Sequence, residues 1–167
     1  QRVALARVLA LEPEILLLDE PFSHIDNFRK NSLRRKLFAY LKQQNITCIV
    51  ATHDSTDVLA FAEEVLIVKD GTVIESGDPK IIYHHPKTNY IASLFGDVNE
   101  FVFKGTSHLV YPHQLKVVAQ SDLNVTLINS YFRGSHYLME ATLDNQHIFF
   151  ESETDIPIGT SVFLTIK

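Results

Sequence analysis

The feature of this sequence that most constrains its fold is an apolar run that stops at two adjacent carboxylates. Ile15 to Leu18 is a run of large apolar residues, and Asp19, Glu20 and Pro21 follow it directly. An apolar run without polar alternation is typical of a strand that helices cover on both faces, as in a parallel sheet. Open α/β sheets bind their ligands at the carboxyl ends of such strands. The run therefore predicts either a ligand site at the acids or an ordinary strand followed by a polar turn.

A second strand of the same kind is predicted for Ile46 to Ala51, and His53 follows it closely. Between the two strands, Asn31 to Lys42 places its apolar residues on one face, which predicts an amphipathic helix. Parallel strands joined by a helical crossover end at the same edge of a sheet. We therefore expect Asp19, Glu20 and His53 to converge on one ligand, which favours the site over the turn.

The predicted helix and the residues just before it carry a cluster of basic side chains. Such a cluster can bind phosphate, but in an acidic protein a solvated helix face is the expected structure. We therefore predict that these side chains are exposed to solvent. The cluster comprises Arg29, Lys30, Arg34, Arg35 and Lys36.

The composition predicts a globular protein that does not bind nucleic acid. Charged residues make up 21% and apolar residues 46% of the chain, and the net charge is -5. A nucleic-acid-binding surface requires basic residues that this balance does not provide. Cys48 is the single cysteine, which excludes an intramolecular disulfide and suits a small buried hydrophobe. No apolar stretch approaches the ~20 residues of a membrane span and no signal peptide is present, so a cytoplasmic location is expected.

Paired carboxylates and a histidine at one sheet edge suit phosphoryl transfer to water. One carboxylate can bind Mg²⁺ through the water shell of the ion, and its neighbour can orient or deprotonate the attacking water. The histidine can contact the terminal phosphate. The phosphate-binding loop G-x-x-x-x-G-K-[ST] does not occur in this sequence. Because the first residues already show helical periodicity without a cap or an initiator Met, we expect the chain to be a fragment of a longer protein.

These motifs, in this order, resemble the ATP-binding subunit of an ABC transporter. The resemblance rests on QRVALARVLALEPEILLLDEPFSHID and on the later ATHD. It implies that Asp19 is the Walker B aspartate, which binds Mg²⁺ through water. It also implies that Glu20 is the catalytic glutamate and that His53 is the switch histidine.

The same resemblance assigns further nucleotide-binding residues. Gln1 matches a position just after the signature motif of the family, and Ser23 to Asp26 match the D-loop. Ser23 and Asp26 are thus implied to bind at the nucleotide site, together with Asp19 and Gln1. His24 departs from the usual D-loop sequence, as Ile25 does more conservatively.

Two domains are predicted. Residues 1–97 resemble the C-terminal half of the ATP-binding domain and include a hairpin around Asp70 and Gly71. From about Val98, short strand-like runs predict a small β-barrel, and VYPHQLKVV resembles the start of a TOBE module, with Tyr111 and His113 as departures. The fold class is therefore α/β, the C-terminal part of a P-loop NTPase-type parallel sheet with helices, followed by an OB- or TOBE-like barrel over residues 98–167. Strands are predicted for 101–103, 115–118, 125–129, 137–143, 147–151 and 162–166.

The aromatic side chains of the second domain are assigned to its core and to dimer contacts. A nucleic-acid-binding barrel would surround such side chains with basic residues, which are few here. The aromatic residues concerned are Tyr131, Phe132, Tyr137, Phe149 and Phe150.

The resemblance implies a subunit that binds and hydrolyses ATP with Mg²⁺ and powers an ABC importer, although the chain alone is expected to be inactive without the loop. The implied partners are a second ATP-binding subunit in a homodimer, membrane permease subunits and, indirectly, a solute-binding receptor, on the inner face of the cytoplasmic membrane. A chromosome-maintenance or repair ATPase of the ABC class is the alternative. For the C-terminal part, a small-anion-sensing or dimerising module is a further alternative. The transported substrate could be a sugar, a polyamine, ferric iron, sulfate or molybdate.

Overall fold

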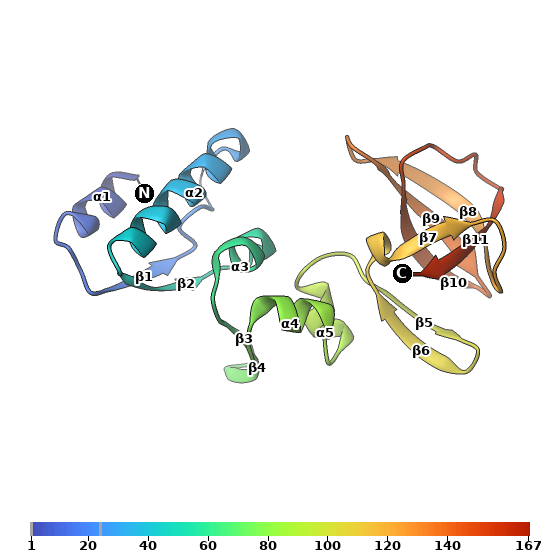
Figure 1. The fold of residues 1–167 in the computed structure, drawn as a ribbon, viewed down its shortest axis with the longest axis horizontal. Helices are drawn as coiled ribbons and strands as arrows, with labels where there is room; N and C mark the ends of the chain where they lie inside the picture. Colours follow the sequence, from blue (N-terminus) through green and yellow to red (C-terminus); the bar gives the residue numbers. More distant parts are fainter. Residues whose placement is uncertain (1, 24) are drawn as a thin grey trace. The chain divides into compact units, whose positions relative to one another are not determined.

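A computed structural model describes residues 2–23 and 25–167 (Figure 1). The chain divides into two compact units, residues 1–82 and residues 83–167. This division lies upstream of the expected boundary between residues 97 and 98, and the assignment of the two family domains remains a prediction. Gln1 and His24, which the sequence analysis singled out, lie outside the described residues.

The first unit contains a parallel pair of strands joined by a helical crossover. Strand β1 (Ile15–Asp19) pairs in parallel with β2 (Thr47–Ala51), and Asp19 lies opposite Ala51 in the register. Helix α2 (Asn27–Gln43) forms the crossover, and α1 (Arg2–Leu9) precedes β1. The predicted βαβ unit is thus confirmed, and α2 begins one turn earlier than the apolar periodicity indicated.

One face of this sheet is buried and the other is exposed. Ile15, Leu17 and Ile49, at alternate positions of the two strands, are 62%, 71% and 60% exposed. The prediction that helices cover both faces is therefore wrong for the described residues, because both α1 and α2 contribute side chains to the core on the same face. That core is formed by Leu16, Phe22, Leu37 and Leu41, with Leu5, Leu9, Leu18, Ile25, Leu33, Phe38, Ile46 and Cys48 packed against it.

The remainder of the first unit is a short helix and a hairpin. Helix α3 (Ser55–Phe61), which the apolar pattern did not predict, follows β2, and β3 (Val65–Lys69) pairs with β4 (Thr72–Gly77). Asp70 and Gly71 have φ values of 49° and 76° between the strands. These left-handed values are those of the two-residue turn predicted for this hairpin. Helix α4 (Pro79–His84) spans the division between the units.

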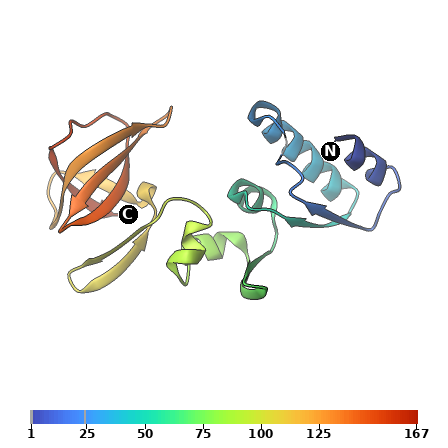
Figure 2. The same cartoon turned by 180° about the vertical axis from the view of Figure 1, so that it is seen from behind.

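The second unit begins with helix α5 (Asn89–Ser93) and a hairpin of β5 (Asn99–Phe103) and β6 (Thr106–Val110). A five-stranded antiparallel sheet of order β10-β9-β8-β11-β7 follows, and Figure 2 shows it from behind. All six predicted strands of this half are confirmed, whereas β6 was not predicted. The sheet consists of β7 (Leu115–Val118), β8 (Leu123–Phe132), β9 (Tyr137–Leu143), β10 (Gln146–Ser152) and β11 (Ser161–Ile166), preceded by the 3₁₀ turn Pro112–Gln114.

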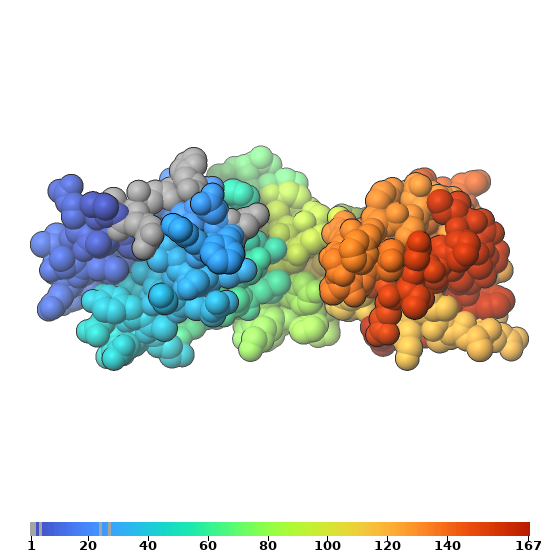
Figure 3. All heavy atoms as spheres, turned by 90° about the horizontal axis from the view of Figure 1, so that it is seen from above, coloured from blue at the N-terminus to red at the C-terminus, as the bar shows by residue number. Residues whose placement is uncertain are grey.

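Alternate residues of these strands face one apolar core, as expected for a half-buried antiparallel sheet. The predicted α/β class followed by a small barrel-like β domain is confirmed. Figure 3 shows that α2, drawn in light blue to cyan, lies at the surface of the first unit, while the strands of the second unit are drawn in yellow to red. The second core comprises Phe101, Val110, Leu115, Leu123, Val125, Leu127, Met139, Ala141, Leu143, Ile148, Phe150, Val162 and Leu164.

The two departures from the TOBE-like pattern take part in a stack of rings within the second unit. The Tyr111 ring stacks on Tyr83 with centroids 4.5 Å apart and an angle of 6°. The His113 ring lies nearly parallel to both tyrosines. Tyr111 is buried, and its hydroxyl donates to the Ala92 carbonyl of α5 at 3.2 Å. Tyr111 and His113 therefore connect the start of the β module to the helical segment before it.

Candidate active site

The carboxyl ends of β1 and β2 lie together, as the sequence predicted. The Glu20 N–H donates to the Ala51 carbonyl at 2.9 Å, so the pairing of the strands continues one residue past Asp19. Glu20 has φ = 44°, in the left-handed region that residues other than glycine rarely adopt. Backbone of this kind is concentrated at functional sites. The chain thus turns at the residue that follows β1.

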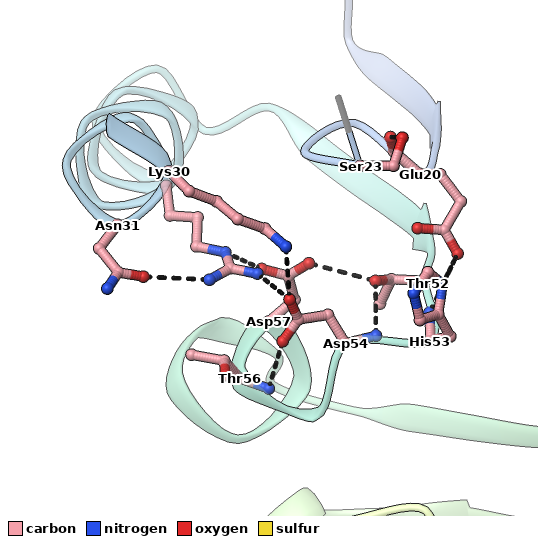
Figure 4. A network of polar contacts seen from close by, with 10 residues as sticks. Glu20, Ser23, Lys30, Asn31, Thr52, His53, Asp54, Thr56 and Asp57 are labelled. Carbon is pink, nitrogen blue, oxygen red and sulfur yellow. Dashed lines mark hydrogen bonds and ion pairs between the residues drawn. The ribbon is translucent and has the colours of Figure 1, made fainter. Parts of the chain in front are cut away.

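Glu20 and His53 are in direct contact across this edge (Figure 4). Glu20 Oε1 lies 2.5 Å from His53 Nδ1 and accepts the His53 backbone N–H at 3.1 Å. The His53 side chain is 83% exposed and that of Glu20 is 36% exposed. The pair is therefore open to solvent and accessible to a ligand.

Of the other proposed site residues, one bonds to this pair and two are exposed at the surface. Ser23 bonds to the backbone of Glu20, because its hydroxyl and its N–H both donate to the Glu20 carbonyl, at 2.9 Å and 3.2 Å. Asp19 is exposed at the end of β1. Asp26 is exposed at the N-cap of α2, where its side chain makes no capping bond. The structure thus brings Ser23 and His53 each into contact with Glu20 and leaves the two aspartates at the surface.

The carboxylates at this edge fit a Mg²⁺ ion that keeps most of its water shell. Among residues 2–23 and 25–167 there is no group of three or more His, Cys, Asp or Glu side chains that could enclose a metal. Mg²⁺ keeps several waters and is bound in proteins through one or two carboxylates and the phosphates of its substrate. A single exposed carboxylate such as that of Asp19 matches this chemistry.

The basic cluster departs from the prediction of a solvated face. Arg29, Arg35 and Lys36 are exposed, as expected. Arg34, however, is only 3% exposed, and Lys30 is partly buried. The expectation is wrong for these two side chains because Lys30 pairs with Asp54, the N-cap residue of α3, and Arg34 pairs with Asp54 and with Asp57 of α3.

Asp54, the residue after His53, accepts bonds from both of these cations. Its Oδ2 lies 2.7 Å from Lys30 Nζ and also pairs with Arg34, while Oδ1 accepts the Thr56 N–H at 3.0 Å and caps α3. Burial disfavours the charged carboxylate, but the hydrogen bonds from Lys30 and Arg34 outweigh it and hold the pKa of Asp54 well below its usual range. Asp54 is therefore ionised at neutral pH.

Asp57 is the second carboxylate of this network and is 5% exposed. Its Oδ1 forms an ion pair with Arg34 Nε that lacks hydrogen-bond geometry, and its Oδ2 accepts the Thr52 hydroxyl at 3.1 Å. Thr52 Oγ1 also accepts the Asp54 N–H at 3.0 Å. Sequence reasoning missed this network, although the i, i+4 spacing of Lys30 and Arg34 and the acids after His53 were signals of it.

A surface pocket of about 370 Å³ lies in the second unit, next to the end of β8. Glu140 is 8% exposed there and accepts bonds from Asn129, Tyr131 and His147, at 3.0, 2.7 and 2.7 Å. The hydrogen bonds from Tyr131 and Asn129 lower the pKa of Glu140. The pocket is lined by Asp97, Val98, Tyr131, Arg133, Leu138, Glu140 and Phe149.

Comparison with known proteins gives homologues along the whole chain, although no family model matches it. The chain is 38% identical over 139 residues to the spermidine/putrescine import ATP-binding protein PotA of Mycoplasma genitalium, a match that covers 82% of this chain and 24% of that protein. It is 37% identical to the protein of the same name from Borrelia garinii subsp. bavariensis, over 100% of this chain and 56% of that protein. The chain thus spans between about a quarter and about half of the length of these curated relatives.

Other relatives carry different substrate names. The Fe(3+) ions import protein FbpC of Escherichia coli O157:H7 and the sulfate/thiosulfate import protein CysA of Pseudomonas aeruginosa match 60% and 70% of this chain. The solved structure of CbiO1 from Clostridium perfringens, described as part of the ABC transporter complex CbiONQ, is 35% identical over 56% of this chain and 37% of its own, with a TM-score of 0.46.

The chain is therefore a homologue of the ATP-binding subunits of ABC transporters. More particularly, the relatives named PotA, FbpC and CysA are ATP-binding subunits of importers, so the resemblance inferred from the sequence is confirmed.

Proposed function

We propose that this chain is part of the ATP-hydrolysing subunit of an ABC importer. The observation that carries the proposal is the Glu20–His53 pair at the carboxyl ends of β1 and β2, with Nδ1 and Oε1 2.5 Å apart. The homology to import ATP-binding subunits supports it. Glu20 acts as the general base toward the attacking water, and His53 contacts the terminal phosphate of ATP.

The two bonds within the pair indicate how these roles are divided. Both bonds from His53 reach Oε1 of Glu20, so Oε2 is the oxygen that can take a proton from water. A carboxylate can only accept, so His53 Nδ1 donates its proton to Glu20, and Nε2 must also carry a proton to donate to a phosphate oxygen. The pair thus couples the position of the base to the position of the phosphate contact.

Asp19 would bind Mg²⁺ through the water shell of the ion, and Ser23 would fix the Glu20 turn. The ion supplies charge neutralisation of the phosphates when bound. Asp26, together with Gln1, is proposed to lie at the nucleotide site by homology. In the described residues no helix is long and apolar enough to cross a membrane. By homology, permease subunits at the cytoplasmic face of a membrane are proposed as partners.

The substrate class that the comparisons favour is a polyamine. The match to the Borrelia garinii protein, which is named for spermidine and putrescine import, extends over the whole chain. The match to the protein named for Fe(3+) ions covers 60% of it. Uptake of labelled spermidine by cells that depend on the intact transporter would test this assignment against ferric iron and sulfate.

The experiment that tests the hydrolytic role uses the intact, full-length protein. Glu20→Gln keeps the shape of the side chain and removes the base, so ATP binding should persist while kcat falls by about two orders of magnitude or more. The matched control is Glu14→Gln. Glu14 is an exposed residue just before β1, and this variant should retain the parental kcat. A Glu20→Gln protein that hydrolyses ATP at the parental rate would overturn the assignment.

A small-anion sensor is the less favoured role for the second unit. Its pocket contains the ionised Glu140, and Arg133 is already paired with Asp97 at 3.0 Å. A dimerising role fits the exposed aromatic residues better.

A further inference from the structure

Arg34 is a buried residue of α2 that contacts the segments following β1 and β2, which carry Glu20 and His53. It does not bond to Glu20 or His53 themselves. Its guanidinium donates to Asn31 Oδ1 at 3.0 Å and pairs with both Asp54 and Asp57. Its Cζ atom lies 5.4 Å from the centroid of the Phe22 ring. Phe22 follows Glu20 by two residues and is 1% exposed, so the same guanidinium contacts the segment that leaves β1 and the segment that leaves β2.

The position of His53 depends on the residues beside it, because its own side chain makes few contacts. The side chain is 83% exposed and the imidazole bonds to Glu20. Its direction therefore depends on Glu20 and on the backbone that carries it. Thr52 is bound through its hydroxyl to Asp57, and Asp54 is bound to the cations of α2. Both neighbours of His53 are thus linked to Arg34. Asp54 pairs with it directly, and Thr52 is linked to it through Asp57.

The guanidinium suits this task in a way that an ammonium does not. Arginine presents several N–H donors in a rigid planar fork, whereas lysine presents a single point charge on a flexible stem. Two nitrogens of Arg34 donate to Asn31 and Asp54, and Nε forms with Asp57 an ion pair that lacks hydrogen-bond geometry. Lys30 supplies an ammonium to Asp54, whereas the ion pair of Asp57 is with Arg34. The several nitrogens of the guanidinium, and not a single point charge, therefore connect the two aspartates.

We propose that Arg34 is a positioning residue for the hydrolytic step, which fixes the backbone on both sides of His53 through Asp54 and Asp57 and so directs the imidazole toward Glu20 and the phosphate. This role rests on the function proposed above for His53. Arg34 itself touches neither substrate nor reacting atoms. Its loss should therefore lower kcat through His53 and leave ATP affinity nearly unchanged.

The test is a double-mutant cycle in the full-length protein, with Arg34→Lys, His53→Ala and the double variant. Arg34→Lys should lower kcat by about tenfold and change the KM for ATP by less than about twofold, because misplacement of a catalytic group affects the chemical step. In the His53→Ala background the same substitution should change kcat by less than about twofold, since the group that it positions is absent. Arg35→Lys, an exposed neighbour on the same helix, is the matched control and should behave like the parent.

A second variant tests the same positioning role with a substitution that should leave the fold intact. Thr52→Val retains shape and removes only the hydroxyl that bonds to Asp57 and to the Asp54 N–H. It should lower kcat by a smaller factor, and this effect too should be absent in the His53→Ala background.

The outcomes separate the two proposals. If His53→Ala retains the parental kcat, the proposed function of His53 fails, and the positioning role fails with it. If His53→Ala lowers kcat but Arg34→Lys lowers it by the same factor with and without His53, the proposed function stands and the positioning role is overturned in favour of general structural support. A parental kcat in Arg34→Lys overturns the positioning role as well.

Discussion

His53 Nδ1 and Glu20 Oε1 lie 2.5 Å apart although the two residues are separated by 33 positions in the chain. The parallel pairing of β1 with β2 produces this contact, because Asp19 lies opposite Ala51 and the next residues of both strands leave the sheet at the same edge. Only a crossover connection can place two such ends together, and α2 provides it. The chemistry of the site is therefore a consequence of topology more than of local sequence.

The 167-residue chain alone should show no metal-dependent ATPase activity and only weak nucleotide binding. It contains no G-x-x-x-x-G-K-[ST] loop, and the backbone amides and lysine of that loop supply most phosphate contacts in such enzymes. Phosphate release by the purified chain, with Glu20→Gln in parallel, measures this. Robust turnover that is insensitive to Glu20→Gln would show that the site assignment is wrong.

Asp54 should make the stability of the first unit depend on pH. A carboxyl group whose pKa is lower in the folded than in the unfolded state stabilises the fold above the unfolded pKa, and this contribution is lost as the pH falls. Asp54→Asn keeps an N-cap side chain but removes the charge that Lys30 and Arg34 bind. We expect it to reduce the free energy of unfolding by about 2 kcal/mol at pH 7, since hydrogen bonds to charged groups contribute about that much.

The pH series checks the sign of this effect. The difference between Asp54→Asn and the parent in urea unfolding should shrink steadily as the pH falls below about 4, near the ordinary pKa of an aspartate. Asp26→Asn, an exposed aspartate whose side chain makes no capping bond, is the control. A difference that is constant from pH 7 to the acid limit would show that the ion pairs do not stabilise the unit.

The strands and the acidic strand end could be predicted from the sequence because both are local signals. Ile15 to Leu18 and the apolar run before His53 need no partner to be recognised, and parallel pairing then brings their ends together. The burial of Arg34 could not be predicted in this way. Its partner Asp54 lies 20 residues further along the chain, and a basic residue beside other basic residues on a helix has the same pattern as a solvated face.

Tyr111 should be important for the stability of the second unit, although the resemblance to the TOBE pattern gives it no role. Tyr111→Phe removes the hydroxyl that bonds to the Ala92 carbonyl and should cost about 1 kcal/mol of unfolding free energy. Tyr111→Ala also removes the ring stacked on Tyr83 and should cost about 3 kcal/mol or more. Urea unfolding of residues 83–167 measures both, with Val102→Ala, which is 57% exposed, as control. Equal stability of all three variants would contradict the role of the ring stack.

The second unit, rather than the α/β unit, should hold this chain together as a dimer. Phe150 is fully buried in the core, but Tyr131 and Phe132 near the end of β8 are 45% and 67% exposed. Exposed aromatic side chains are enriched at protein interfaces. The Phe132 ring packs against Tyr137 of the neighbouring strand β9, with centroids 5.1 Å apart, so an apolar surface is already formed at this end of the hairpin.

Residues 83–167 are the appropriate segment for the test, because Tyr111 requires Tyr83 and the Ala92 carbonyl, which a segment that begins at residue 98 lacks. This segment should sediment as a dimer at micromolar concentration. Phe132→Ser should shift it to monomer, while Val102→Ser, an exposed apolar residue on the separate β5–β6 hairpin, should not. If residues 83–167 remain monomeric and the dimer forms only when residues 1–82 are present, the contact lies on the α/β unit. The exposed aromatic residues of β8 would then have a different role.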